Sequence, residues 1–337
     1  MHRGKLLTVI LLAGCIFSLK KMEAQSTQIR GFVDVYARLQ DSKVSFGLGE
    51  QDLFITSELN DRFSFLGESV FKFSLGSPTT FDVSIERVIL KYNFSGNHNL
   101  LIGKHHTPIN YWNDTYHHGR VFFPTIDRPL LFGANIIPLH TTGISVQGHD
   151  LGNVKFGYDF MVGNGIGSSD VLDNDKHKSI TAAVHIKPVD DLRLGASYYR
   201  DVISKGAVTH DGHLVNWKIN QQLATGSIAY FGKKFELLTE GTLAINKSDT
   251  TYTQHSIGSY AYAGVKIGEK WVPYVRVDYL HYPAGEIFFH KDNTTAVLAG
   301  LRYHINYLAV VKLEVEHDDS NMLGKTNKLT AQIAIGF

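Results

Sequence analysis

The last eleven residues, 327–337, are the feature that most constrains what this chain can fold into. Their sequence, NKLTAQIAIGF, alternates between apolar residues and small or polar ones, and it stops on an aromatic residue. Terminal residues of soluble domains are usually frayed and polar. A closed barrel in lipid instead needs a last strand with one apolar face, sealed against the first strand. The alternation predicts such a strand, with these residues on its apolar face: Leu329, Ala331, Ile333, Ile335 and Phe337.

The first 25 residues have the pattern of an export signal. His2, Arg3 and Lys5 form a basic start, and an apolar run follows over 6–19. This run is too short to cross a membrane as a helix. We therefore expect a signal peptide over 1–25, removed after export, and one mature domain over 26–337.

Cys15 is the single cysteine of the chain. The preceding Leu-Ala-Gly has the pattern of a lipoprotein signal, in which the cysteine would be lipidated. The alternative is that Cys15 is lost with the signal peptide, and Ile16 and Phe17 favour it because they continue the apolar run. On that alternative the mature domain has no disulfide.

Composition leaves two classes of protein open. The chain has 337 residues, a net charge of +1, 16 Tyr, 20 Phe and 31 Gly. Beyond the signal, no apolar stretch reaches the roughly 18 residues of a membrane helix, so we expect a soluble protein or a β-barrel. The balanced charge gives no reason to expect nucleic acid as a partner.

Period-two alternation recurs through the whole mature domain, which predicts strands. A soluble sandwich also alternates, but here the apolar faces are long and the opposite faces mix charges with Gly, Ser and Ala, which favours a membrane barrel with a wet interior. We predict an all-β, closed antiparallel transmembrane barrel of about 16 strands. The expected strands are 28–39, 51–59, 63–74, 82–93, 99–105, 139–150, 153–163, 178–187, 191–200, 222–231, 235–246, 257–267, 271–282, 294–304, 307–317 and 327–337.

Short turns alternate with longer loops along these strands. Membrane barrels have short periplasmic turns and longer outer loops, so the alternation predicts both termini on the periplasmic side. The longest connection, 106–138, is then the third outer loop. It is rich in aromatic residues, among them Trp112, Phe122 and Phe123. Long loops without strands in compact proteins are usually functional, and we expect this one to fold inward as a constriction.

Residues 103–119, GKHHTPINYWNDTYHHG, resemble a segment of porin-like outer-membrane proteins that are broadly grouped with the phosphate-selective porin O/P family. The terminal Phe337 strand is similar to the closing strand of Gram-negative outer-membrane barrels, where it serves as an assembly signal. The resemblance implies an outer-membrane porin for passive diffusion of small hydrophilic solutes or ions, and no enzyme. The expected lumen departs from a phosphate-selective one, because acidic residues such as Asp34, Asp278 and Glu314 stand among its arginines.

The candidate pore residues follow from this architecture. The charged residues of loop 106–138 could set a transverse electric field across the pore, which would select ions. They could instead form local salt bridges that hold the loop, and one arrangement could do both. The arginines of the wall motivate a mild anion preference. The constriction is predicted to comprise Tyr111, Trp112, Asp114, His117, Arg120, Asp127 and Arg128, and the lumen wall Arg30, Arg38, Arg193, Arg276 and Arg302.

Other kinds of site are less well supported. His105, His106, His117 and His118 form two pairs, but neighbouring side chains on an extended chain point opposite ways, so we expect no metal and no cofactor. No GxSxG motif is present to indicate a hydrolase.

Two alternatives to a porin stay open, a non-conducting barrel with a surface binding or adhesion role and, less favoured, a barrel enzyme acting on envelope lipids. Expected partners are outer-membrane lipid and lipopolysaccharide, the barrel-assembly machinery and, by analogy with porins, two further copies in a homotrimer.

Overall fold

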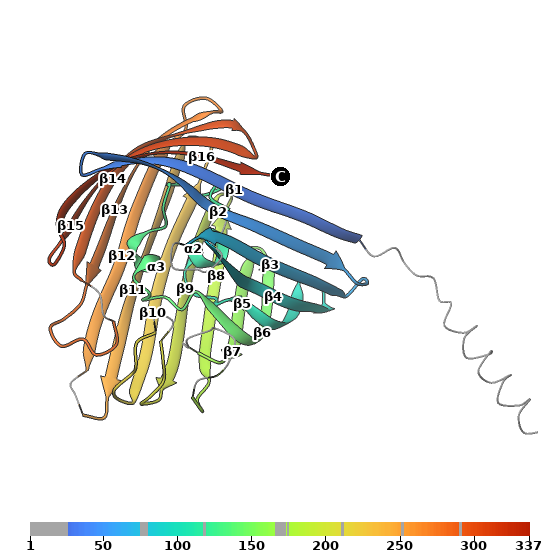
Figure 1. Cartoon of the computed structure of the whole chain (residues 1–337). Coiled ribbons are helices and arrows are strands. Elements are labelled where there is room, and N and C mark those ends of the chain that lie inside the picture. Colours follow the sequence, from blue (N-terminus) through green and yellow to red (C-terminus); the bar gives the residue numbers. More distant parts are fainter. Residues whose placement is uncertain are drawn as a thin grey trace, which may run out of the picture.

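The computed structural model describes residues 26–74, 80–116, 119–165, 173, 175–209, 212–250, 253–289 and 292–337. In these ranges sixteen antiparallel strands form a closed barrel (Figure 1). The strands are β1 (Ser26–Gln40), β2 (Lys43–Glu58), β3 (Phe63–Phe73), β4 (Phe81–Ser95), β5 (His98–His106), β6 (His140–Leu151), β7 (Phe156–Gly163), β8 (Ser179–Val189), β9 (Leu192–Ile203), β10 (Ile219–Phe231), β11 (Phe235–Ser248), β12 (Gln254–Val265), β13 (Trp271–His281), β14 (Thr294–Asn306), β15 (Ala309–Ser320) and β16 (Gly324–Gly336). The predicted all-β barrel and its strand number are confirmed.

The two faces of each strand differ in a way that fits a membrane barrel. On β13, Val275 and Val277 are 52% and 45% exposed, whereas Arg276 and Asp278, which alternate with them, are 1% and 0% exposed. A soluble sheet would bury the apolar face and expose the polar one. In a closed barrel the buried polar face is the interior face, and the exposed apolar face is the one that suits lipid.

The barrel closes between its first and last strands. β1 pairs with β16, with Phe32 opposite Gly336, so the start of β1 and the C-terminus lie at the same rim. Beyond this ladder, Gly31 and Phe337 exchange two backbone hydrogen bonds of 2.9 Å each. A Cβ atom at Gly31 would lie 2.5 Å from the Phe337 ring, so this closure requires glycine. The predicted sealing of the last strand against the first is confirmed.

One expected loop is wrong. Residues 40–50 were expected to connect two strands, but β1 continues to Gln40 and β2 begins at Lys43. Asp41 and Ser42, with φ angles of 50° and 62°, form a two-residue turn of the kind that matches the twist of a hairpin. The first half of β2 holds two glycines because Tyr36 and Asp34 of β1 fill the space beside them.

The long connection between β5 and β6, residues 107–139, contains two short helices, α2 (Tyr111–Thr115) and α3 (Leu130–Gly133). Both helices lie within the outline of the barrel in Figure 1. No helix among the described residues is long and apolar enough to cross a membrane. The predicted signal peptide over 1–25, with Cys15, lies outside the described residues.

Candidate functional site

The β5–β6 segment, residues 107–139, is fastened at its base. The Thr107 amide donates to the Leu139 carbonyl at 3.1 Å, and the Thr107 and Thr141 hydroxyls lie 2.7 Å apart. The Asn113 side-chain amide donates to both the Thr107 and the Leu139 carbonyl, at 2.9 and 3.0 Å. The two ends of the segment are therefore held together, next to the ends of β5 and β6.

An aromatic cluster packs the first helix of the segment against the far strands. Trp112 is fully buried, and its ring lies 5.2 Å from that of Tyr116, 5.4 Å from that of Phe123 and 5.9 Å from that of Tyr260 on β12. The cluster extends through Phe132 of α3. Trp112, predicted as a constriction residue, is thus a packing anchor.

Carboxyl groups on the buried strand face accept backbone N–H groups of the segment. Glu240 of β11 accepts from Tyr111 and, at 3.1 Å, from Trp112. Three more carboxyls do the same at 3.2–3.3 Å, and these pairs are Gly119 with Asp52, Ile126 with Glu314, and Leu130 with Asp278. The amides of Tyr111, Trp112 and Leu130 lie in the first turns of the two short helices, where no intrahelical acceptor is available, so the strands supply one.

Cationic side chains on the same face donate to backbone carbonyls of the segment. Arg276 donates to the Asp127 carbonyl at 2.7 Å, and Arg302 donates to the Pro124 carbonyl at 2.9 Å. Lys312 donates to the Arg120 and Thr125 carbonyls at 2.6 and 2.9 Å.

Two residues predicted for the lumen wall contact the segment directly. Arg276 and Arg302 are 1% and 5% exposed and pair at 2.8 Å with Asp278 and Glu236. Both side chains lie on the buried face of their strands, and both donate to backbone carbonyls of the segment.

The tip of the segment forms ion pairs with β1 and β2. Arg120 lies 2.8 Å from Asp127 and 3.5 Å from Asp34, and Arg38 lies 2.8 Å from the other Asp127 oxygen. Arg128 and Glu50 are 4.0 Å apart. Predicted constriction residues are thus joined to a predicted wall residue by local salt bridges, and the transverse field stays a prediction.

These pairs affect the protonation of Asp127. Burial alone would raise the pKa of Asp127, but the guanidinium groups of Arg120 and Arg38 outweigh burial and hold that pKa below its ordinary value of 3.8. The carboxylate therefore stays charged through the neutral range.

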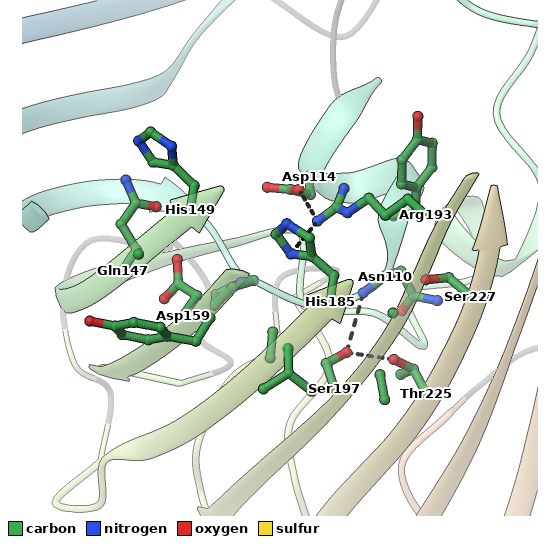
Figure 2. A pocket seen from close by; sticks show the side chains of 18 residues that line it. Asn110, Asp114, Gln147, His149, Asp159, His185, Arg193, Ser197, Thr225 and Ser227 are labelled. Carbon is green, nitrogen blue, oxygen red and sulfur yellow. Dashed lines mark hydrogen bonds and ion pairs between the residues drawn. The ribbon is translucent and has the colours of Figure 1, made fainter. Parts of the chain in front are cut away.

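A cavity of about 180 Å³ separates the start of the segment from strands β6–β10 (Figure 2). Asp114 enters it from the segment and pairs with Arg193 of β9 at 2.9 Å. The same guanidinium donates to His185 at 3.1 Å and lies 5.1 Å from the centre of the Tyr111 ring. Asp114, Tyr111 and Arg193, all predicted pore residues, therefore meet at one place.

The remaining predicted residues do not join these groups. Arg30 is exposed near the start of β1 and donates to the Gln28 side chain at 2.9 Å. His117 and His118 lie outside the described residues. In the described ranges, no group of three or more His, Cys, Asp or Glu residues is placed to hold a metal ion.

Sequence reasoning missed Glu240, which caps α2, and Glu236, which pairs with Arg302. The sequence held a signal for them, because both glutamates fall on the same face of the predicted strand 235–246. Buried charges are rarely left unpaired, so two glutamates on an interior face would predict partners inside the barrel.

Solved structures with this fold include outer-membrane proteins of several bacteria. An anion-selective porin from Comamonas acidovorans has a TM-score of 0.68 at 11% identity, covering 93% of this chain and 100% of its own. The trimer form of OmpT, an outer membrane protein of Vibrio cholerae, has a TM-score of 0.66 at 14% identity, covering 94% and 100%. The outer membrane channel DcaP of Acinetobacter baumannii has a TM-score of 0.63 at 13% identity, covering 95% and 99%.

The chain has the barrel fold of these proteins. At such identities the likeness concerns the fold alone. No protein-family model and no curated protein sequence matches the chain.

Proposed function

We propose that the protein is an outer-membrane porin, which lets small hydrophilic solutes and ions diffuse passively through a water-filled barrel. One observation carries this proposal: a cavity that includes charged and hydroxyl side chains in its lining lies between the β5–β6 segment and strands β6–β10 of a closed barrel. Charged and hydroxyl side chains line the cavity, as a path for hydrated solutes requires. The solute would cross unchanged, so no chemical step is assigned.

In this proposal the β5–β6 segment narrows the barrel. Its contacts with interior-face residues of β1, β2, β11, β13, β14 and β15 support an inward position. Because its amides and carbonyls are both held by charged side chains, the segment would act as a fixed constriction and not as a mobile plug.

The arginines give little support to an anion preference. Arg276 and Arg302 are buried beneath the segment, and Arg38 and Arg193 are each paired with an aspartate. The resemblance of residues 103–119 also suggests phosphate selectivity. That selectivity would need unpaired arginines in the lumen as well, so these arginines give it little support. We therefore propose a porin for small hydrophilic solutes without deriving anion selectivity from this set.

Location and partners follow from the same proposal. We place the barrel in the outer membrane of a Gram-negative bacterium, exported by a cleaved signal over 1–25 and surrounded by lipid and lipopolysaccharide. The closing strand that ends at Phe337 would be read by the barrel-assembly machinery. A homotrimer is the proposed assembly, since one protein of the same fold is described in a trimer form.

Liposome swelling tests the proposal. The purified, folded protein is reconstituted into liposomes, which are then diluted into isotonic solutions of sugars of increasing size. A porin produces swelling whose rate falls as the sugar becomes larger. Swelling no faster than that of protein-free liposomes, for every sugar and for small amino acids, would reject the function.

The alternative of a non-conducting barrel has one observation in its favour. The aromatic and aliphatic cluster around Trp112 joins the β5–β6 segment to strands β9–β14 and fills that side of the interior. If the rest of the interior were closed as well, the swelling assay would show no permeation while the barrel was correctly folded.

A further inference from the structure

The cavity beside the β5–β6 segment has an uneven distribution of charge. Its lining includes one arginine, Arg193, and two aspartates, Asp114 and Asp159, all within the described part of the chain. Arg193 is already neutralised by Asp114 at 2.9 Å. One carboxylate, that of Asp159, therefore remains without a compensating cation.

Asp159 is placed by β7 on the cavity side of the wall, as Figure 2 shows. Its cross-strand neighbours are Gln147 of β6 and Ala183 of β8, so one side is polar and the other is small. In the part of the chain that the structure describes, Asp159 receives a hydrogen bond from the Ser145 hydroxyl and forms no ion pair. A charged carboxylate is costly to bury unless a cation pairs with it, so a cationic ligand would favour the charged form of Asp159.

The remainder of the wall offers hydrogen bonds to a polar solute. The Ser197 and Thr225 hydroxyls lie 2.5 Å apart, and Ser227 follows on the same strand face as Thr225. The other titratable groups of the lining are Tyr111, His149, Tyr158 and His185. The cavity has a volume of about 180 Å³. A cavity needs only about 15 Å³ to hold one water molecule, so this one has room for a small solute.

We propose that this cavity is a binding site for small hydroxylated solutes that carry a primary ammonium group, with Asp159 accepting the ammonium. The hydroxyls of Ser197, Thr225 and Ser227 would contact the polar body of the solute. The Arg193–Asp114 pair lies where the segment and β9 meet in the lining of the cavity. This inference deepens the proposed function and rests on it, since the site lies on the proposed path.

The test uses D-glucosamine as the probe and D-glucose as its neutral counterpart. Each sugar is added to single channels of the full-length protein in a planar bilayer in near-neutral KCl. Glucosamine should interrupt the current in a concentration-dependent manner, and glucose should do so far more weakly. Asp159→Asn should weaken the glucosamine effect about tenfold or more, the size expected for a lost charge-assisted hydrogen bond.

A matched control is Asp190→Asn, because Asp190 lies in the turn after β8 and its side chain is 92% exposed. This variant should leave the glucosamine effect unchanged. Steady conductance with equal effects of both sugars, or with no loss in Asp159→Asn, would overturn the inference while leaving the porin function intact.

If the protein does not conduct, saturation-transfer NMR with glucosamine and the detergent-solubilised barrel decides the question separately. Binding that is lost in Asp159→Asn would support the site even though the porin function had failed. Absence of binding to the wild-type barrel would overturn the site as well. The heat-modified shift in gel mobility confirms in each case that the variant barrel is folded.

Discussion

The Nη1 atom of Arg276 on β13 lies 2.7 Å from the carbonyl oxygen of Asp127 in the β5–β6 segment. A buried guanidinium that donates to backbone carbonyls fixes the path of the segment at that point. Its own charge is balanced by Asp278 at 2.8 Å, and Asp278 in turn accepts the Leu130 amide. The strand side chains and the segment backbone thus form one continuous polar network.

Replacing Arg276 with Met should release this part of the segment. The change removes the donor to the Asp127 and Arg128 carbonyls, at 2.7 and 3.4 Å, and leaves Asp278 as an uncompensated buried charge. We therefore expect a loss of about 3–5 kcal/mol in the free energy of unfolding. Thermal unfolding monitored by gel mobility would show a lower midpoint, and channels would show noisier current. Arg62→Met, in an exposed turn, is the control. An unchanged midpoint in Arg276→Met would contradict the role given to this residue.

Glu240→Gln should loosen α2 without changing its shape. The Glu240 side chain accepts two backbone amides and the Tyr260 hydroxyl at 2.5 Å, and an amide can offer only one acceptor oxygen. We expect a loss of about 1–3 kcal/mol in the free energy of unfolding. Chemical denaturation in detergent measures this, with Glu269→Gln in the β12–β13 turn for comparison. Equal stability of the two variants would refute the capping role.

Gly31→Ala should impair closure of the barrel. A Cβ atom there would lie 2.5 Å from the Phe337 ring and 2.7 Å from the Asp52 carbonyl oxygen, so backbone must shift. The matched control is Gly226→Ala on β10, where no atom lies within 4 Å of the added Cβ. The fraction of folded, heat-modifiable protein should fall for Gly31→Ala alone. Similar yields for the two variants would show that the contact with Phe337 does not matter.

The salt bridges at the tip of the segment should fail only in acid. The pKa of Asp127 is lower in the folded protein than its ordinary 3.8, so its stabilising contribution is present above that value and is lost as the pH falls through the lower, folded one. Conductance noise from the tip should therefore be constant from neutral pH down to about 5 and rise below about 3.9. Asp127→Asn should show, at neutral pH, the raised conductance noise that the wild type shows in acid. A transition near neutrality that vanishes in Asp127→Asn would contradict this assignment.

Much of the barrel could be predicted because lipid imposes a simple rule on every strand. Where the rule was obscured, the prediction failed. Lys43–Glu58 carries Val44, Phe46 and Leu48 on its apolar face, but Gly47 and Gly49 gave this stretch the composition of a loop. Those glycines belong in the strand because Tyr36 and Asp34 occupy the space beside them.

The site was less predictable because its contacts join distant parts of the chain. Alternation predicted an interior face for Arg276 and Arg302, but the backbone carbonyls that they bind lie 149 and 178 residues away in sequence. Alternation identifies which face a side chain occupies and says nothing about what covers that face. The pairing of Asp114 with Arg193 likewise depends on the path of the β5–β6 segment, which no local pattern specifies.

Single-channel conductance in a planar bilayer tests the central claim most directly. The wild type is compared with a variant in which residues 109–137 are replaced by a short Gly-Ser linker, which the Thr107–Leu139 contact allows. A barrel narrowed by this segment predicts steady wild-type conductance under a KCl gradient and a clearly larger conductance in the variant. A silent wild type in a folded barrel, or equal conductance in both proteins, would contradict the account.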